Sequence, residues 1–411
     1  MKLTFVVQRY GADFVGGAEK YGRSMATGLA ADGHDVTVVT SCATSYADWA
    51  DEYEPGTSVD RGVTVHRVSV LAPRDNDRFI PLHLRALDIS QEPLWPWAQE
   101  RWSQTVGPDL TPAIPLVEEL AATSDVTTFI GYHYAHTLRL TRHAAAHGAT
   151  VVVPTAHPEG AFHIGRVGQM FQHADRIVCL APEEADLVGD VYGHRDRIEV
   201  VPCPVEPAEA PDRSEVEAAA ATFGVTPDRY GIVVGRIDPA KGSDDATRFA
   251  TGYRSMVDPD FQLVVVGPGG DGGPPPEGVV PTGFIDDASK DALVAGAGVL
   301  IQPSYMESFS LALMEGWLYE RPALIQRRSR VLAGHAERSG GGFTYLDYLD
   351  FEAALHALAR DPALARRLGR RGRDYVLEAF AWPAVSQRFL SVATAAADHG
   401  AARLARRSVR P

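Results

Sequence analysis

The sequence predicts an α/β protein made of two successive, doubly wound halves, each built on a parallel sheet. The chain has 411 residues, which is too many for one ordinary hydrophobic core and favours two domains of roughly 200 residues each. Short β-branched runs alternate with helical patterns throughout the chain, which is typical of parallel sheets. The proline- and acid-rich stretch EVVPCPVEPAEAPDR (199–213) lies between the halves, and we expect its end to be the linker.

In the first half, the apolar runs predict six strands. The first helix follows the first strand, since Ala18, Tyr21, Met25 and Leu29 recur at helical spacing and Gly33 supplies a C-terminal stop. The expected strands are LTFVV (3–7), DVTVVT (35–40), VTVHRV (63–68), VTTFI (126–130), TVVVP (150–154) and RIVCLA (176–181).

The second half restarts the same alternation. The glycine- and proline-rich segment GPGGDGGPPPEG (267–278) is expected to be a loop. The arginine-rich stretch ARRLGRRGR (365–373) is expected to be a solvated helix face, with weak peripheral contact to acidic membrane lipid as the alternative. The expected strands are YGIVVG (230–235), FQLVVVG (261–267), GVLIQPS (298–304) and PALIQ (322–326), and the expected helices lie at about 244–256, 287–296, 309–319 and 350–360.

Composition excludes several classes of protein. The formal net charge of −14 argues against a nucleic-acid binder, so an anionic ligand must be held by local positive groups. Cys42, Cys179 and Cys203 are few and scattered, without metal-ligand spacing, which favours a reducing compartment. The first apolar run is too short for a signal peptide, and no run approaches the ~20 residues that span a bilayer. We therefore expect a cytoplasmic protein.

Unusual residues gather directly after four predicted strands. These strand ends carry QRYGADFVGGAEK, TAHPEG, RIDPAKG and YMESFS. In open parallel sheets, ligands bind beyond the carboxyl ends of the strands. A ligand in a cleft between two facing halves would explain all four segments together.

Glycines and cations in two of these segments suit an anion. The amides of Gly16 and Gly17 precede a helix and can approach a phosphate closely, although a simple glycine turn is the alternative. A dinucleotide fingerprint G-x-G-x-x-G is absent there, which counts against nicotinamide binding. Arg236 and Lys241 lie in one short loop and would together neutralise a diphosphate without a metal, the alternative being two solvated cations.

The stretch ESFSLALMEG (307–316) places one glutamate on each side of a helix start. Helical spacing groups Leu311, Met314, Glu315 and Leu318, which predicts that Glu315 lies in or beside the buried face. Glu307 precedes the helix, and the amides of 308–311 are its free N-terminal donors. The alternative makes Glu307 a surface acid and pairs Glu315 with a core Arg or Tyr.

Taken together, these motifs resemble glycosyltransferase family 4, a group of retaining, nucleotide-sugar-dependent enzymes with the GT-B fold. The matching segments are VGGAE (15–19), GRIDPAKG (235–242), TGFIDD (282–287), ESFSLALME (307–315) and RDYVLEAFAW (373–382). The resemblance implies two facing Rossmann-like domains, 1–205 for the acceptor and 206–381 for the donor, with 382–411 forming a helix that crosses back to the first domain and a basic tail.

The resemblance also implies a role for each residue. Gly16 and Gly17 would approach the donor phosphate or the acceptor, Arg236 and Lys241 would hold the diphosphate, Glu307 would contact the donor sugar, and His157 would lie beside that sugar. Glu315 would bind the ribose, and the Ile285 backbone would meet the base. The catalytic residues expected are Glu307, His157, Arg236 and Lys241. The donor-binding residues expected are Gly16, Gly17, Gly235, Arg236, Lys241, Ile285, Glu307, Ser308, Phe309, Ser310, Leu311 and Glu315.

On the acceptor side, the candidates are Arg9, Tyr10, Tyr132 and His133. The segments SQEPLWPWAQERW (90–102) and GYHYAH (131–136) supply aromatic side chains that suit sugar stacking or, alternatively, core packing. The sequence departs from the family pattern at Ser310, where glycine is common, and in RPALIQRRSR (321–330).

The implied reaction is retaining transfer of a sugar from a UDP-, GDP- or dTDP-linked donor to a hydroxyl acceptor, in glycan, glycolipid or secondary-metabolite biosynthesis. Neither a metal nor a cofactor is expected beyond the nucleotide sugar, which is a co-substrate. A GT-B epimerase or phosphorylase is the alternative enzyme, and a catalytically silent sugar-nucleotide-binding protein is the alternative that is not an enzyme.

Overall fold

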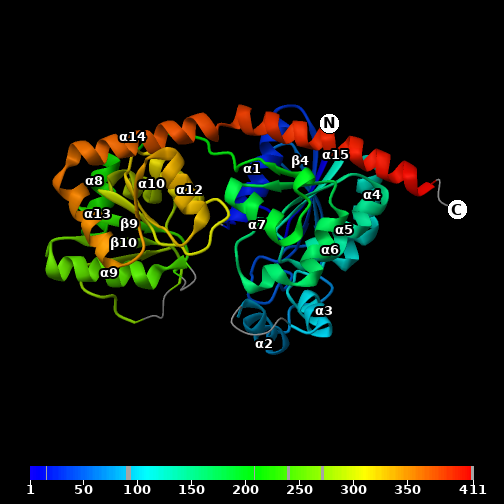
Figure 1. Ribbon diagram of the computed structural model, residues 1–411, viewed down its shortest axis with the longest axis horizontal. Coiled ribbons are helices and arrows are strands. Elements are labelled where there is room, and N and C mark those ends of the chain that lie inside the picture. Colours follow the sequence, from blue (N-terminus) through cyan, green and yellow to red (C-terminus); the bar gives the residue numbers. More distant parts are fainter. Residues whose placement is uncertain (15, 89–93, 208, 238–240, 270–272, 409–411) are drawn as a thin grey trace. The chain divides into compact units, whose positions relative to one another are not determined.

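The chain divides into two compact units in a computed structural model that describes residues 1–14, 16–88, 94–207, 209–237, 241–269 and 273–408 (Figure 1). Unit 1 comprises Met1–Pro204 and Trp382–Pro411, and unit 2 comprises Val205–Ala381. The C-terminal segment therefore belongs to the same unit as the N-terminus. Parts of the expected segments at 15, 90–93, 238–240, 270–272 and 409–411 lie outside the described residues.

Unit 1 is built on an eight-stranded sheet with the order β3-β4-β2-β1-β5-β6-β7-β8. All pairs are parallel except β3 with β4. The strand order runs outward from β1 in both directions, so right-handed crossovers place helices on both faces of the sheet. The strands are β1 (Lys2–Val6), β2 (Asp35–Ser41), β3 (Gly56–Asp60), β4 (Val63–Val68), β5 (Val126–Ile130), β6 (Thr150–Val153), β7 (Arg176–Cys179) and β8 (Ile198–Val200).

The helices of unit 1 cover a core that includes Phe129, Phe162 and Trp102, all fully buried. The α-helices are α1 (Gly17–Ala31), α2 (Asn76–Leu87), α3 (Pro96–Thr105), α4 (Ile114–Thr123), α5 (Ala135–His147), α6 (Gly165–His173), α7 (Pro182–Tyr192) and α15 (Trp382–Ser408), with short 3-10 helices η1 (Thr111–Ala113), η2 (Gly160–His163) and η3 (Arg195–Arg197). Gly33 follows α1 with a φ of +87°, so the expected glycine stop is confirmed.

The terminal helix α15 is fixed to unit 1 by a buried carboxylate. Asp175, with a side chain only 1% exposed, accepts hydrogen bonds from Arg403 Nη2 at 2.9 Å and from His399 Nδ1 at 2.6 Å. Burial alone would raise the pKa of Asp175, but the hydrogen bonds from Arg403 and His399 outweigh it and lower the pKa. Nearer its start, the Trp382 ring packs on α1 at Gly28, where an added Cβ would lie 2.4 Å from ring carbons.

Unit 2 is built on a six-stranded, fully parallel sheet with the order β11-β10-β9-β12-β13-β14. Here the order runs outward from β9 in both directions. The strands are β9 (Tyr230–Val234), β10 (Gln262–Val266), β11 (Val279–Gly283), β12 (Val299–Gln302), β13 (Ala323–Gln326) and β14 (Gly342–Tyr345).

The helices of unit 2 pack on a second core, which includes Phe249, Tyr345 and Phe351. They are α8 (Arg213–Thr222), α9 (Ser243–Met256), α10 (Asp287–Gly296), α11 (Leu311–Leu318), α12 (Arg330–Ser339), α13 (Tyr348–Arg360) and α14 (Pro362–Ala379). In α14 the side chains of Arg366, Arg367, Arg370 and Arg371 are exposed, which confirms the expected solvated face. Within the described residues, no helix has the length and apolar character needed to cross a bilayer.

All ten strands expected from the sequence are present near their expected positions, and the doubly wound α/β class is confirmed. The four strands that were not expected are β3, β8, β11 and β14, and each of them is an edge strand. Their residues are mostly exposed or half-buried, so they lack the apolar runs that mark the central strands.

Candidate functional site

In both units, several of the expected residues lie where the strand order reverses. In unit 1 this switch point lies between the neighbouring strands β1 and β5, and in unit 2 it lies between β9 and β12. The loops that leave these strands at their carboxyl ends carry Gly16 and Tyr132 in unit 1, and Lys241 and Glu307 in unit 2. A switch point opens a crevice for ligands in doubly wound sheets.

The loop after β1 ends at α1, whose N-cap is Gly16 and whose first residue is Gly17. A Cβ at Gly16 would lie 2.1 Å from Glu19 Oε2, so the buried Glu19 side chain requires glycine at this position. Gly17 is exposed, and a Cβ there would meet no atom within 4 Å. Packing therefore explains Gly16, whereas Gly17 leaves the helix N-terminus open to an anion.

Arg9 lies inside unit 1 in the structure. Its Nε and Nη2 donate to Glu19 Oε1 at 2.9 and 2.8 Å, and the two side chains are only 9% and 1% exposed. The Arg9 guanidinium also lies 3.5 Å from the ring centroid of Tyr46, which donates to the same carboxylate. Tyr10 is 1% exposed. These two acceptor candidates stabilise the loop from within, and their contact with an acceptor stays a prediction.

Tyr132, His133 and His157 are brought together at the ends of β5 and β6, around Glu159. The Tyr132 hydroxyl donates to Glu159 Oε1, and His157 Nδ1 lies 3.6 Å from Glu159 Oε2. The side chains of His157 and Glu159 are 25% and 15% exposed, whereas Tyr132 is fully buried. Burial lowers the pKa of His133 to about 4 although the charge of Glu159 opposes this, so His133 is neutral near pH 7.

Sequence reasoning missed Glu159. Its signal is modest: an acid two residues after His157, in the strand-end segment TAHPEG. The structure gives it two of the expected site residues, Tyr132 and His157, as neighbours, and it therefore joins them as a candidate site residue.

A second missed residue, Glu184 of α7, holds the loop that leads to His157. Its carboxylate accepts from the Leu180 amide at 2.6 Å and from the Ala156 amide, and it is 1% exposed. Thr155, next to Ala156, has a φ of +51°, a conformation that non-glycine residues rarely adopt. Burial raises the pKa of Glu184 to about 8, against the effect of the two backbone hydrogen bonds.

In unit 2, Lys241 and Glu307 form an ion pair across the switch point. Lys241 Nζ lies 2.8 Å from Glu307 Oε1, and the side chains are 40% and 14% exposed. Gly235, with a φ of +143°, and the exposed Arg236 follow β9 in the same loop. The structure thus brings the expected phosphate-binding and sugar-binding groups into direct contact.

The helix after Glu307 is α11, and it begins at Leu311 rather than at about 309 as expected. Ser310 precedes it with a φ of +82°, a region favourable to glycine, and Gln302 Nε2 donates to its hydroxyl at 2.6 Å. Phe309 is 3% exposed and packs on His335 and Phe380. Ser308 is half-buried. The family's glycine is thus replaced by a serine that keeps the glycine-like backbone.

The predicted buried stripe of α11 was partly wrong. Leu313, Met314, Gly316 and Trp317 are buried, whereas Leu311, Glu315 and Leu318 are half-buried. The reason is that α11 packs toward α14 as well as onto the sheet, so Trp317 is buried in place of Leu318 and donates to the Gly341 carbonyl at 2.9 Å.

Glu315 lies at the margin of this face and pairs with Lys290 of α10. Its Oε2 lies 3.4 Å from Lys290 Nζ, and the side chains are 23% and 14% exposed. Burial would lower the pKa of Lys290, but Glu315 and two neighbouring aspartates outweigh it and raise the pKa. Lys290 belongs to α10, which starts two residues after the half-buried Ile285, so the expected ribose and base positions lie on neighbouring elements.

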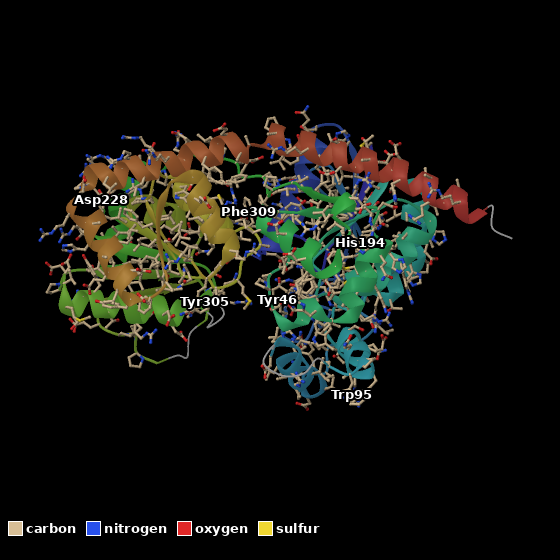
Figure 2. The ribbon with its side chains drawn as sticks, viewed as in Figure 1. Tyr46, Trp95, His194, Asp228, Tyr305 and Phe309 are labelled. Carbon is tan, nitrogen blue, oxygen red and sulfur yellow. The ribbon has the colours of Figure 1, made fainter. Side chains whose placement is uncertain are left out.

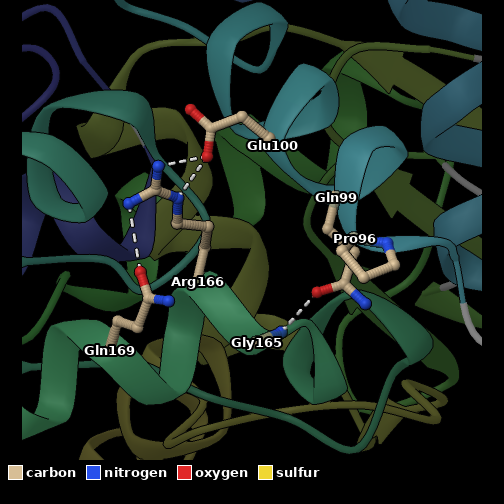
Figure 3. A pocket seen from close by; sticks show the side chains of 6 residues that line it. All are labelled: Pro96, Gln99, Glu100, Gly165, Arg166 and Gln169. Carbon is tan, nitrogen blue, oxygen red and sulfur yellow. Dashed lines mark hydrogen bonds and ion pairs between the residues drawn. The ribbon is translucent and has the colours of Figure 1, made fainter.

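The aromatic residues of 90–102 divide into two groups. Trp102 is fully buried in the core of unit 1, as the core-packing alternative predicts, but Trp95 and Trp97 are 73% and 64% exposed. A hollow of about 210 Å³ beside them contains none of the expected site residues (Figure 3). Its Arg166 is already paired with Glu100, and its Gln99 accepts from the Gly165 amide at 2.8 Å.

The fold and these strand-end loops define a GT-B glycosyltransferase fold. HepE of Anabaena, solved in complex with UDP and glucose, superposes with a TM-score of 0.69 at 14% identity, over 95% of this chain and 98% of that one. The E. coli structure of trehalose-6-phosphate bound with UDP-2-fluoro glucose gives a TM-score of 0.69 at 12% identity, over 96% of this chain and 99% of that one.

Sequence comparison agrees, with a glycosyl transferase 4-like domain matched over residues 16–204. The D-inositol 3-phosphate glycosyltransferase of Streptomyces bingchenggensis is 30% identical over 277 residues, which cover 61% of this chain and 58% of that protein, less than two thirds of its length. The protein of the same name from Acidothermus cellulolyticus is 28% identical over 427 residues, covering 93% and 86%. The chain is thus similar to glycosyltransferase family 4 proteins in sequence and to GT-B glycosyltransferases in fold.

Proposed function

We propose that the chain is a retaining, hexosyltransferase-like glycosyltransferase that moves a sugar from a nucleotide-diphosphate sugar to a hydroxyl acceptor. Unit 2 binds the donor and unit 1 binds the acceptor. The observation that carries the proposal is the Lys241–Glu307 pair at the switch point of unit 2. It supplies a cation for a phosphate and a carboxylate for sugar hydroxyls within one hydrogen bond of each other.

In the proposed reaction, the bond between the anomeric carbon and the diphosphate oxygen breaks, and a new bond forms from that carbon to the acceptor oxygen on the same face. The acceptor proton passes to the departing diphosphate. Lys241 and Arg236 stabilise the negative charge that develops on this leaving group, which is the task a metal ion performs in other enzymes. Glu307 orients the sugar and is not assigned as a nucleophile.

The unit 1 site supports the acceptor role. His157 and Glu159 are partly exposed at the strand ends, backed by the buried Tyr132 and the neutral His133. Hydrogen-bonding groups of this kind suit hydroxyls. The solved neighbour HepE holds UDP and glucose, and the relatives are named for D-inositol 3-phosphate. We therefore infer a nucleotide-sugar donor and a polyhydroxylated acceptor, with D-inositol 3-phosphate as the first acceptor to assay.

A thermal-shift screen of UDP-, GDP- and dTDP-sugars tests the proposal. A donor at about 100 times its Kd stabilises the folded chain by about 2.7 kcal/mol and raises its melting temperature. Lys241→Ala should reduce this stabilisation. Absence of stabilisation by any of the three nucleotides would reject the proposal. A rearranged sugar nucleotide formed without acceptor would point to an epimerase, and stabilisation without any product would point to a silent binding protein.

A further inference from the structure

The segment after β13 carries three exposed arginines at the same sheet edge as Glu307. Arg327, Arg328 and Arg330 link β13 to α12. Strand β13 is the parallel neighbour of β12, so the carboxyl ends of both strands meet at one edge. These arginines lie in the stretch RPALIQRRSR, where the sequence departs from its family pattern, and the proposed catalytic groups do not explain them.

Two contacts join the segment after β13 and the following helix α12 to the loop that carries Glu307. The Arg328 guanidinium lies 5.3 Å from the ring centroid of Tyr305, two residues before Glu307. On the other side, the ring of His335 in α12 lies 5.4 Å from the ring of Phe309, two residues after Glu307. Figure 2 labels Tyr305 and Phe309, whose rings are these two contact points. Arg328 is therefore a neighbour of the Glu307 loop through packing and not only through strand order.

The charge of this segment is not balanced locally. Arg327 lies 3.3 Å from Asp350. Among the described residues, Arg328 and Arg330 have no carboxylate within ion-pair distance. The acids nearby already have partners, since Glu307 pairs with Lys241 and Asp245 pairs with Arg248. In a chain of net charge −14, the unneutralised Arg328 guanidinium beside the Glu307 loop, with Arg330 two residues further along the chain, points to an anionic partner.

The strand order places this charge relative to the proposed donor. Across the sheet, the base contact at Ile285 follows β11, the diphosphate cation Lys241 follows β9, Glu307 follows β12 and the arginines follow β13. The arginines thus lie beyond Glu307, on the side away from the nucleotide. An anion bound there belongs to the sugar end of the reaction.

We propose that Arg328 and Arg330 bind a carboxylate or phosphate group carried by a substrate next to Glu307. The planar guanidinium fork matches both anions. The inference rests on the proposed function and deepens it, because it makes one substrate an acidic sugar or polyol: either the donor transfers a hexuronate, or the acceptor carries a phosphate close to its reacting hydroxyl.

Calorimetry on the full chain tests the donor source. The affinities of UDP, GDP and dTDP are measured first. Two sugar derivatives of the nucleotide that binds are then compared, one carrying a hexuronate and one the matching hexose, such as UDP-glucuronate and UDP-glucose or GDP-mannuronate and GDP-mannose. The wild type should prefer the hexuronate. R328Q/R330Q should weaken the affinity for the hexuronate donor by about tenfold or more, which is the loss expected for a charge-assisted contact. The affinity for the free nucleotide should stay unchanged. R327Q is the matched control, because Arg327 is also exposed but is paired with Asp350.

The acceptor source is tested with glucose 6-phosphate and glucose, titrated into the nucleotide-saturated chain. A preference for the phosphate that R328Q/R330Q abolishes would assign the site to the acceptor. The inference would be overturned if wild type and R328Q/R330Q showed the same preference between hexuronate and hexose donors and the same preference between glucose 6-phosphate and glucose. The proposed function would remain intact. Failure of all three nucleotides to bind would instead overturn the proposed function.

Discussion

Lys241 and Glu307 lie 66 positions apart in the chain and meet across 2.8 Å, where the loops after β9 and β12 converge. The Glu307 side chain is only 14% exposed, and the lysine provides the cation that such a carboxylate needs. An ammonium group has three N–H donors. Lys241 can therefore keep Glu307 and still donate to a diphosphate oxygen, which in the proposed reaction would link sugar orientation to leaving-group stabilisation.

Replacing Lys241 or Arg236 with alanine is expected to lower turnover by at least ~10²-fold, because each removes a contact to the charge that develops on the leaving diphosphate. Steady-state assays with the donor identified by thermal shift measure this effect. Arg366→Ala, on the exposed face of α14, is the control for loss of a surface cation. Near wild-type turnover of both variants would exclude the phosphate assignment.

Glu159→Gln is expected to lower kcat by about 10- to 100-fold while leaving nucleotide binding unchanged, because it removes the charge that holds His157 and Tyr132 in place. Kinetics and nucleotide calorimetry on the same variant separate the two effects. Glu118→Gln is the matched control, since Glu118 holds His143 in a similar carboxylate–histidine pair at 2.9 Å elsewhere in unit 1. If Glu159→Gln and Glu118→Gln lowered kcat equally, Glu159 would affect turnover only through the stability of unit 1.

Glu184 is expected to make unit 1 less stable as the pH rises. Burial raises its folded-state pKa to about 8 from an ordinary value of 4.5. Between pH 4.5 and pH 8, Glu184 keeps a proton in the folded chain that it releases in the unfolded chain. Its contribution to the free energy of unfolding is therefore complete below pH 4.5 and decreases progressively as the pH rises to 8. The slope is about −1.4 kcal/mol per pH unit.

Urea unfolding of the wild type and Glu184→Gln between pH 5 and pH 9 measures this slope. The variant cannot titrate at this position, so its free energy of unfolding should lack the decrease, whatever its absolute stability. Glu118→Gln should keep the wild-type slope. A parallel pH dependence in the wild type and Glu184→Gln would show that the buried carboxylate does not titrate in this range.

The central strands could be predicted from the sequence because their signal is local. VTTFI coincides with β5 and TVVVP contains β6, since buried parallel strands consist of continuous β-branched and apolar runs. The edge strands β3, β8, β11 and β14 pair on one side only and are short or exposed, so their residues carry no such pattern. Their positions depend on the neighbouring strand.

The candidate site divides in the same way. The sequence places Lys241, Glu307 and His157 at strand ends, because each follows a strand that local patterns predict. It could not show that Arg9 is internal, that Glu315 pairs with Lys290, or that Glu159 lies between Tyr132 and His157. Each of these depends on a partner from another element.

The sequence by itself determined the alternation of strands and helices, the two-part organisation and the strand ends that carry charged residues, because hydrophobic periodicity and turn residues act over a few positions. Only the tertiary structure decided which of those charges meet. The strand order brings the β9 and β12 loops together at the switch point, and side-chain packing sets Arg328 beside Tyr305. Ion pairs between residues distant in sequence depend on how strands order and helices pack, and no local pattern encodes that geometry.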